Sequence, residues 1–132
     1  MDYFSDDYLQ QHLLEIALDI LERPEEASAA YTRGIELEPE CEDLYCNFGQ
    51  LVRKSDLAKA DALFCKAIEL RPDFAEAHRE LGSLLLRQRV LDESEYHLRR
   101  AIQLDPADPW AHLHLGNLLE TKHDTHAAAV EF

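Results

Sequence analysis

The stretch ADALFCKAIELRP, residues 60–72, decides the fold, because it recurs twice along the chain at a nearly constant spacing. One copy, SEYHLRRAIQLDP, covers residues 94–106, and another, ASAAYTRGIELEP, covers residues 27–39. The three stretches close on Pro39, Pro72 and Pro106, so the two intervals between them differ by a single position. A period of this length indicates an array of structural repeats.

A second landmark recurs with the same period. It is a glycine inside an apolar segment, found in LYCNFGQLV (44–52), AHRELGSLL (77–85) and AHLHLGNLL (111–119). Apolar residues in both landmarks fall three and four positions apart, which is the spacing of an amphipathic helix, and no alternating strand pattern occurs. Each period therefore predicts two helices, the second ended by a proline that lacks an amide hydrogen.

Local signals predict where the helices begin and end. Asp73 and Asp108 follow two of the prolines and are expected to cap the next helix, because aspartate accepts bonds from amides at a helix start. The repeated glycines lie inside helices, where glycine costs ~1 kcal/mol relative to alanine, so we expect close helix–helix approach there. In the last repeat we expect an inter-helix turn at His123 and His126, and a second helix that contains Phe132.

The repeated positions resemble the tetratricopeptide repeat family, in which an aromatic residue, Leu-Gly, alanine, a second aromatic residue and proline recur with a fixed period. The matching residues are Tyr45, Phe48, Gly49, Ala60, Phe64, Ala67 and Pro72, then Leu81, Gly82, Leu85, Leu98, Ala101 and Pro106, then Leu115, Gly116, Leu119, Ala128 and Phe132. The resemblance implies an all-α fold, a right-handed α–α superhelix (solenoid) of about three and a half helix-turn-helix units.

The resemblance covers nearly the whole chain, which we expect to form one domain. Its parts are an N-terminal extension (1–7), a degenerate first repeat (8–41), a second repeat (42–74), a third repeat (75–108) and a truncated fourth repeat (109–132). No polar capping helix follows the fourth repeat, so we expect the chain either to be part of a longer protein or to cover this edge with a partner.

The resemblance also implies a non-catalytic scaffold or adaptor, which binds a peptide segment of a partner protein in its concave groove. The residues expected to line this groove are Asn47, Gln50, Arg53, Lys54, Arg79, Ser83, Arg87, His114 and Asn117. Arginine pairs with carboxylates and side-chain amides bind a peptide backbone, so this set suits an extended or acidic peptide. The alternative is a solvated surface that has no ligand.

Some family members bind the C-terminal carboxylate of chaperones through a clamp of lysine, asparagine and arginine. Only Asn47 matches one of the five clamp positions; the other four are occupied by His12, Ile16, Glu76 and Glu80. The sequence therefore predicts that this chain has no chaperone clamp.

The first predicted helix carries a second apolar stripe, formed by Leu9, Leu13, Ile16 and Ile20. A helix that is apolar on two faces is usually buried on both. The stripe either contacts a partner or is covered by residues 1–7. Two alternatives to the adaptor follow: a homodimer through this helix or the uncapped C-terminal edge, and a substrate-recruiting arm of a larger enzyme such as a glycosyltransferase.

Composition argues against several other functions. The net charge of −14, from 27 acidic and 13 basic residues, argues against binding to nucleic acid or to an anionic membrane. The sequence has no phosphate loop, catalytic triad context or recognisable metal-ligand spacing, so we expect no catalytic residue, metal or cofactor. The three cysteines lack disulfide spacing, which favours a reducing, cytoplasmic location.

Three further residues have alternative interpretations. His78 and His112 occupy the aromatic position of their repeats, so we expect them in the core and not as metal ligands. Cys46 is expected to be a buried, inert thiol, the alternative being a reactive thiol in the groove.

Overall fold

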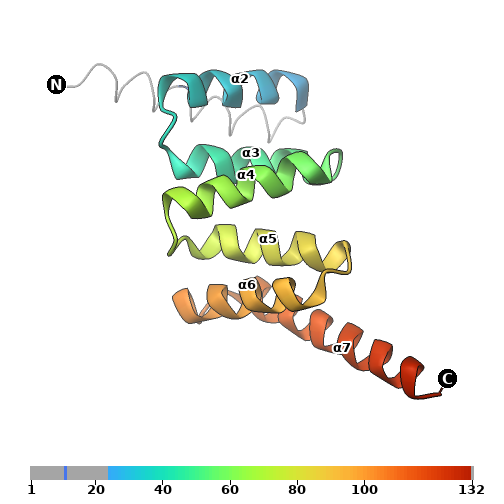
Figure 1. The fold of residues 1–132 in the computed structure, drawn as a ribbon. Helices are drawn as coiled ribbons and strands as arrows, with labels where there is room; N and C mark the ends of the chain where they lie inside the picture. The colour runs from blue at the N-terminus through green and yellow to red at the C-terminus, as the bar shows by residue number, and fades with distance from the viewer. Residues whose placement is uncertain (1–10, 12–23, 132) are drawn as a thin grey trace. The chain divides into compact units, whose positions relative to one another are not determined.

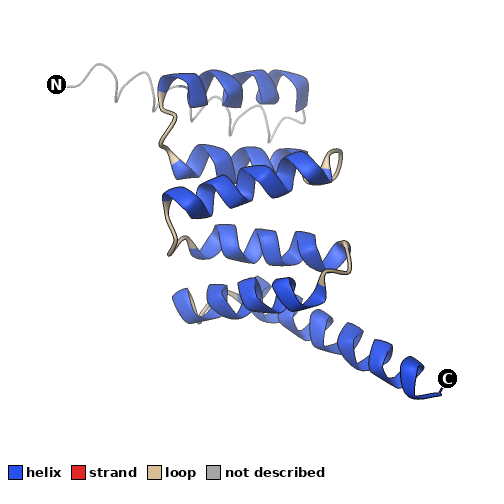
Figure 2. Ribbon diagram, in the orientation of Figure 1, coloured by secondary structure: helices blue, strands red, loops and turns tan. Residues whose placement is uncertain are grey.

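A computed structural model describes Gln11 and residues 24–131, for residues 127–131 the backbone alone. This part of the chain contains six labelled helices (Figure 1) and no strand (Figure 2). It divides into two compact units between Pro72 and Asp73. The first unit contains α2 (Pro24–Leu37), α3 (Glu42–Val52) and α4 (Leu57–Leu70), and the second contains α5 (Ala75–Arg87), α6 (Leu91–Leu104) and α7 (Pro109–Glu131).

The prolines end the helices as the sequence predicted. Helices α2, α4 and α6 each stop two residues before Pro39, Pro72 or Pro106. The residue before a proline is biased out of the helical region, so the helix cannot continue into it. The repeat period therefore corresponds to helical hairpins, α3–α4 in the first unit and α5–α6 in the second.

Two aspartates cap helices, and one expected cap is wrong. The Asp56 carboxylate accepts a bond of 3.1 Å from the Lys59 amide at the start of α4. Asp108 accepts a bond of 3.0 Å from the Trp110 amide at the start of α7, which confirms its predicted role. Asp73 does not cap α5, because the buried Phe74 occupies the position before the helix. Burying an aromatic ring stabilises the fold by more than a side-chain cap does.

The core of the first unit forms where the backbone of α3 approaches α4 at a glycine. A Cβ atom added to Gly49 would lie 2.6 Å from Cε1 of Phe64, so any side chain here would overlap the fully buried ring. Phe48, one residue earlier, stacks on Tyr31 of α2 with the ring centroids 5.3 Å apart. The glycine therefore allows Phe64 to contact the α3 backbone directly.

The second unit repeats this arrangement between α5 and α6. A Cβ atom on Gly82 would lie 2.7 Å from Cγ of Leu98 and 3.2 Å from its backbone nitrogen. The space also admits the buried Ser94 hydroxyl, which donates a 2.6 Å hydrogen bond to the Gly82 carbonyl oxygen. The close approach predicted from the repeated glycine is confirmed in both hairpins.

Gly116 of α7 differs from the other two glycines. Nothing lies within 4 Å of a Cβ atom built on it, and the residue is exposed. Close helix–helix approach was predicted here and is not found among the described residues. The reason is that none of the described helices lies against this face of α7.

The turn predicted at His123 and His126 is also absent, and α7 continues through it to Glu131. No glycine or proline interrupts the sequence after Gly116, and the Thr125 hydroxyl donates a 2.9 Å bond to the Thr121 carbonyl within the same helix. Residues 127–129 are alanines, which have the highest helix propensity. The local sequence therefore favours one long helix over a hairpin.

An ion pair holds the middle of α7 against α6. The Lys122 ammonium lies 2.8 Å from Asp92 Oδ1 and 2.9 Å from Glu95 Oε1. Hydrogen bonds to these two carboxylates raise the pKa of Lys122. Because Asp92 is in the first turn of α6, the residues of α7 beyond Lys122 extend past the end of that helix (Figure 1).

The glycine contacts predict opposite effects for one chemical change. Gly82→Ala should lower the free energy of unfolding by about 1–3 kcal/mol, because the new methyl group overlaps Leu98. Gly116→Ala, in open space, should raise it by up to about 1 kcal/mol, because alanine favours the helix. Urea denaturation of dilute protein followed by circular dichroism measures both. Effects of the same sign would contradict the contacts described for these residues.

Candidate functional site

Three of the predicted groove residues form a stripe along α5. Arg79, Ser83 and Arg87 are four residues apart, so they share one face of the helix. Ser83 is half-buried and Arg87 is exposed, whereas only 18% of the Arg79 side chain is exposed. The stripe is therefore most accessible at its C-terminal end.

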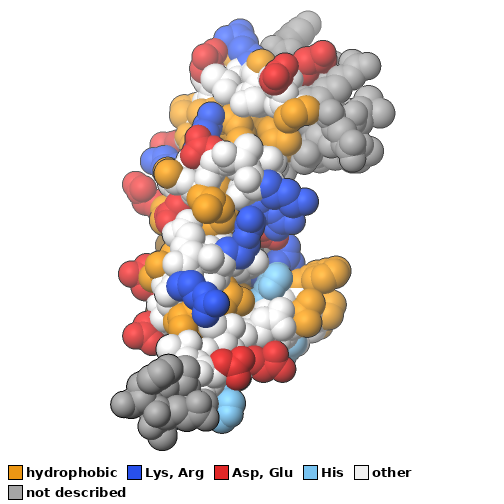
Figure 3. Space-filling view, turned by 90° about the vertical axis from the view of Figure 1, so that its right-hand side faces the viewer, with side chains coloured by type: hydrophobic (Ala, Val, Ile, Leu, Met, Phe, Trp, Pro, Cys, Tyr) orange, Lys and Arg blue, Asp and Glu red, His pale blue; other side chains and the backbone are white. Residues whose placement is uncertain are grey.

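The neighbouring helix α7 contributes apolar as well as polar groups. Trp110 and Leu113 are 58% and 50% exposed, which is unusual for large apolar side chains. His114 is half-buried, and Asn117 is exposed one turn further on. In the lower part of the face drawn in Figure 3, exposed hydrophobic side chains lie beside histidine and acidic side chains.

An ion pair fixes the direction of α7 relative to α5. Arg79 Nη1 donates a 2.7 Å bond to Oδ2 of Asp108, the residue that caps α7. The N-terminal ends of the two helices therefore lie together, and the helices run in the same direction. We call the exposed groups along this pair the α5–α7 surface; its members are Ser83, Arg87, Trp110, Leu113 and Asn117.

Arg79 is already neutralised by acidic neighbours. Its guanidinium also lies 3.1 Å from Glu80 and 3.8 Å from Glu76. Burial alone would lower the pKa of Arg79, but the hydrogen bonds to Asp108 and Glu80 outweigh burial and raise it. The sequence predicted Arg79 as a groove residue, and the structure places it in an internal ion-pair network.

Asp108 is the acidic partner of this network. Burial alone would raise the pKa of Asp108, but the bond from Arg79 and the backbone amides of Trp110 and Ala111 hold it below its usual range. The carboxylate thus stays ionised on folding, and it caps α7 while it anchors Arg79.

Arg87 has the opposite environment. Among the described residues, its guanidinium makes no ion pair or hydrogen bond, and the side chain is exposed at the end of α5. Because its charge is not compensated locally, Arg87 is the cation of the α5–α7 surface that is available to an anionic ligand.

The other predicted groove residues lie on or just after α3 in the first unit. Asn47, Gln50 and Arg53 are half-buried, and Lys54 is exposed in the turn after the helix. Nε2 of Gln50 lies 4.0 Å from the sulfur of Cys46. Cys46 itself is fully buried, which favours the inert-thiol interpretation over a reactive groove thiol.

The apolar stripe Leu9, Leu13, Ile16 and Ile20 lies outside the described residues, as does His12. Neither partner contact nor cover by residues 1–7 is therefore decided. Both interpretations stay predictions.

The two histidines at the aromatic position differ from each other. His78 is buried as predicted, and its Nδ1 lies 3.0 Å from Nδ1 of His97. The prediction for His112 is wrong, because this residue is exposed and its Nε2 lies 2.9 Å from the carbonyl oxygen of Pro106. Tyr45 makes the corresponding bond to the residue six positions before it, from its hydroxyl to Pro39. A polar ring therefore suffices at this position, because its task is to bind the turn.

Two further properties concern the described part of the chain as a whole. No three His, Cys, Asp or Glu side chains gather there in a way that could hold a metal ion. None of its helices combines the length and the apolar character needed to span a bilayer.

Sequence reasoning overlooked Trp110 as a candidate site residue. The available signal was its spacing: Trp110, Leu113 and Asn117 are three and four residues apart, on the face of α7 that its buried Ala111 and Leu118 do not occupy. The neutralisation of Arg79 had no local signal, because Asp108 follows it by 29 residues.

The geometry and the comparisons agree on the class of protein. The described helices and their hairpins define a helical-repeat protein. Residues 50–109 match the tetratricopeptide repeat profile and place the chain in the tetratricopeptide repeat family. The predicted family and its all-α repeat fold are thereby confirmed.

Curated relatives share part of this sequence. The chain is 37% identical over 83 residues to tetratricopeptide repeat-containing protein trd-1 of Caenorhabditis elegans, an alignment that covers 62% of this chain and 10% of that protein. It is 40% identical over 76 residues to protein O-mannosyl-transferase TMTC3 of Homo sapiens, covering 54% of this chain and 8% of that protein. The chain thus spans about a tenth of these relatives.

A solved structure is similar over most of the chain. The first TPR of Spaghetti (RPAP3), bound to the HSP90 peptide SRMEEVD, superimposes with a TM-score of 0.85 at 20% sequence identity. The match covers 90% of this chain and 95% of that one. A likeness at this identity shows the fold, which is the one predicted from the repeat.

The ion pair of Arg79 predicts a pH dependence of stability. Because the folded pKa of Asp108 is lowered, its contribution is present at neutral pH and is lost as the pH falls below about 4. Asp108→Asn keeps a good helix cap but removes the charge, so it should cost about 1–3 kcal/mol at pH 7. The cost should shrink at pH 3, as measured by urea denaturation at both pH values. A cost independent of pH would contradict the ionic role.

Proposed function

We propose that the chain is a non-catalytic scaffold that binds a peptide segment of a partner protein, and that the α5–α7 surface is a binding site. The observation that carries this proposal is the exposure of Trp110 and Leu113 on the same helix pair as the uncompensated Arg87. Exposed aromatic and arginine side chains are the usual anchors of protein interfaces.

The order of groups along the surface specifies the ligand. Trp110 lies at the end of the helix pair where Arg79 meets Asp108, and Arg87 is eight residues further along α5, about 12 Å away. An extended peptide advances about 3.3 Å per residue, so about four residues span this distance. The expected ligand is an extended segment with a large apolar residue about four positions from a carboxylate.

The polar groups between these anchors complete the argument. Ser83 and Asn117 lie along the same helices and supply a hydroxyl and an amide for the peptide backbone. The peptide bound to the similar structure, SRMEEVD, contains both apolar and acidic residues. It is a suitable first probe, although only one of five positions of the chaperone clamp matches here.

Peptide binding is testable through Trp110, which is the only tryptophan of the chain. We expect peptides with leucine and aspartate separated by two to four serines to change its fluorescence, and peptides with adjacent leucine and aspartate to bind more weakly. Arg87→Glu should raise the dissociation constant of the best peptide at least about tenfold, because a charge-assisted bond becomes a repulsion.

The matched control is Arg100→Glu. It makes the same charge change on α6, where Arg100 bonds to Gln103, outside the α5–α7 surface. We expect this variant to change the dissociation constant less than twofold. If no peptide in the series alters the fluorescence, or if both variants weaken binding equally, the α5–α7 surface is not the site.

A second candidate function is the recruiting arm of a larger enzyme. The observation that favours it is the 40% identity to a region of protein O-mannosyl-transferase TMTC3. In this case the chain itself would remain non-catalytic, and the proteins that it binds would be acceptors of sugar transfer. Identification of the bound segments separates the candidates: sugar-modified sequences favour the recruiting arm, and unmodified ones favour the adaptor.

Three further predictions accompany this proposal. Support for the repeat boundaries 42–74 and 75–108 comes from the α3–α4 and α5–α6 hairpins, which fall inside them. The α3 residues Asn47, Gln50, Arg53 and Lys54 stay predicted contacts. A cytoplasmic location stays the expectation from the cysteine content.

A further inference from the structure

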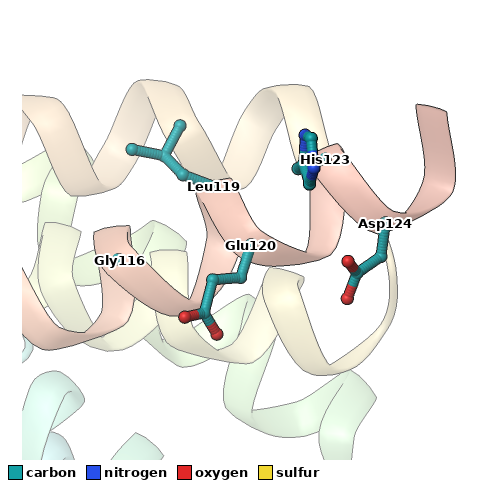
Figure 4. Close-up of a pocket in the computed structure, with 5 residues that line it drawn as sticks. All are labelled: Gly116, Leu119, Glu120, His123 and Asp124. Carbon is teal, nitrogen blue, oxygen red and sulfur yellow. The ribbon is translucent and has the colours of Figure 1, made fainter. Parts of the chain in front are cut away.

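The open face of α7 around Gly116 is the part of the described chain that departs most from the repeat. It forms a shallow hollow of about 550 Å³ lined by Gly116, Leu119, Glu120, His123 and Asp124. Leu119 and His123 lie along one edge of the helix, and the carboxylates of Glu120 and Asp124 lie along the other (Figure 4). Leu119 is 43% exposed although it follows the glycine that marks helix approach elsewhere.

The two complete hairpins show what such a face accepts. Phe64 fills the space at Gly49, and Leu98 fills it at Gly82. Each is preceded four residues earlier by a small, fully buried residue, Ala60 or Ser94. The partner segment is therefore a helical turn that pairs a small residue with a large apolar one.

The chain contains a third segment with this pattern. In THAAAVEF (125–132), Ala128 and Phe132 stand one repeat period after Ser94 and Leu98. The separation of Phe132 from Gly116 in the sequence equals that of Leu98 from Gly82. The segment thus matches the open face in both its small and its large position.

Within one chain this match cannot be made while α7 is continuous. The helix runs unbroken from Pro109 to Glu131, so Glu131 lies about 22 Å along the axis from Gly116. The ion pairs of Lys122 with Asp92 and Glu95 hold the middle of the helix on α6, which opposes a bend there. A second copy of the chain can supply the segment without any bend.

We propose that two copies of this chain associate by exchanging their C-terminal segments, so that residues 125–132 of each copy cover Gly116 of the other. The contact is reciprocal, because each copy presents both the open face and the segment that fits it, as a two-fold interface requires. Phe132 then takes the place that Phe64 and Leu98 have in the hairpins. This surface of α7 is separate from the α5–α7 surface, so the inference does not depend on the proposed peptide binding.

The mass of the full chain in solution tests this inference. Sedimentation velocity between 1 and 100 μM should show a shift from 15.2 kDa to twice that mass. Salt should strengthen the association, because each copy carries a net charge of −14 and ions screen the repulsion. A chain that stays at 15.2 kDa throughout, including one whose α7 folds back on itself, overturns the proposal.

Two pairs of variants locate the contact. Phe132→Glu should raise the dimer dissociation constant at least about tenfold, whereas Phe132→Leu should preserve it, because leucine fills the same place in the α5–α6 hairpin. Gly116→Leu should block the open face, whereas Gln103→Leu adds the same apolar side chain at an exposed position of α6. Circular dichroism confirms that each variant folds. A dimer that is insensitive to Phe132→Glu and Gly116→Leu, as expected of contact through Leu9, Leu13, Ile16 and Ile20, overturns the exchange.

Discussion

Both complete hairpins depend on a steric constraint: the backbone of one helix must come within van der Waals distance of a large side chain of the next. Gly82 satisfies it because its missing Cβ leaves room for Leu98 and for the Ser94 hydroxyl. Gly49 does the same for Phe64. The cost of glycine inside a helix, ~1 kcal/mol, is small beside the burial of a large apolar side chain. The repeat period is thus a consequence of where close approach has to recur.

The sequence was sufficient for those features that are decided within one repeat. The positions of Pro39, Pro72 and Pro106 predicted where α2, α4 and α6 end, and the glycines predicted the helix contacts of α3 and α5. The fate of α7 was not predictable in this way, because a turn forms only when the residues beyond it gain more by packing than by extending a helix. The alanines of residues 127–129 favour extension, and Asp124 alone does not outweigh them.

The site was predicted less completely than the fold, and Arg79 and Arg87 show why. Both are arginines on one face of α5, so pattern and spacing treat them alike. Their difference comes from Asp108, which lies 29 residues beyond Arg79 and becomes its neighbour only when α7 packs beside α5. Charge compensation depends on contacts that are remote in sequence, whereas helix ends depend on neighbours. Residues that bind a ligand are therefore harder to predict than residues that shape a hairpin.

Helix α7 brings these arguments together, because its three sides have different tasks. At about 100° per residue, Ala111 and Leu118 face one side, where they are buried, and Trp110 and Leu113 face a second. Gly116 and Leu119 face the third side. A helix with apolar residues on all sides is expected inside a protein core, and in an exposed position it implies that more than one side has a partner. Peptide binding and exchange between copies use different sides of α7, so one chain has room for both.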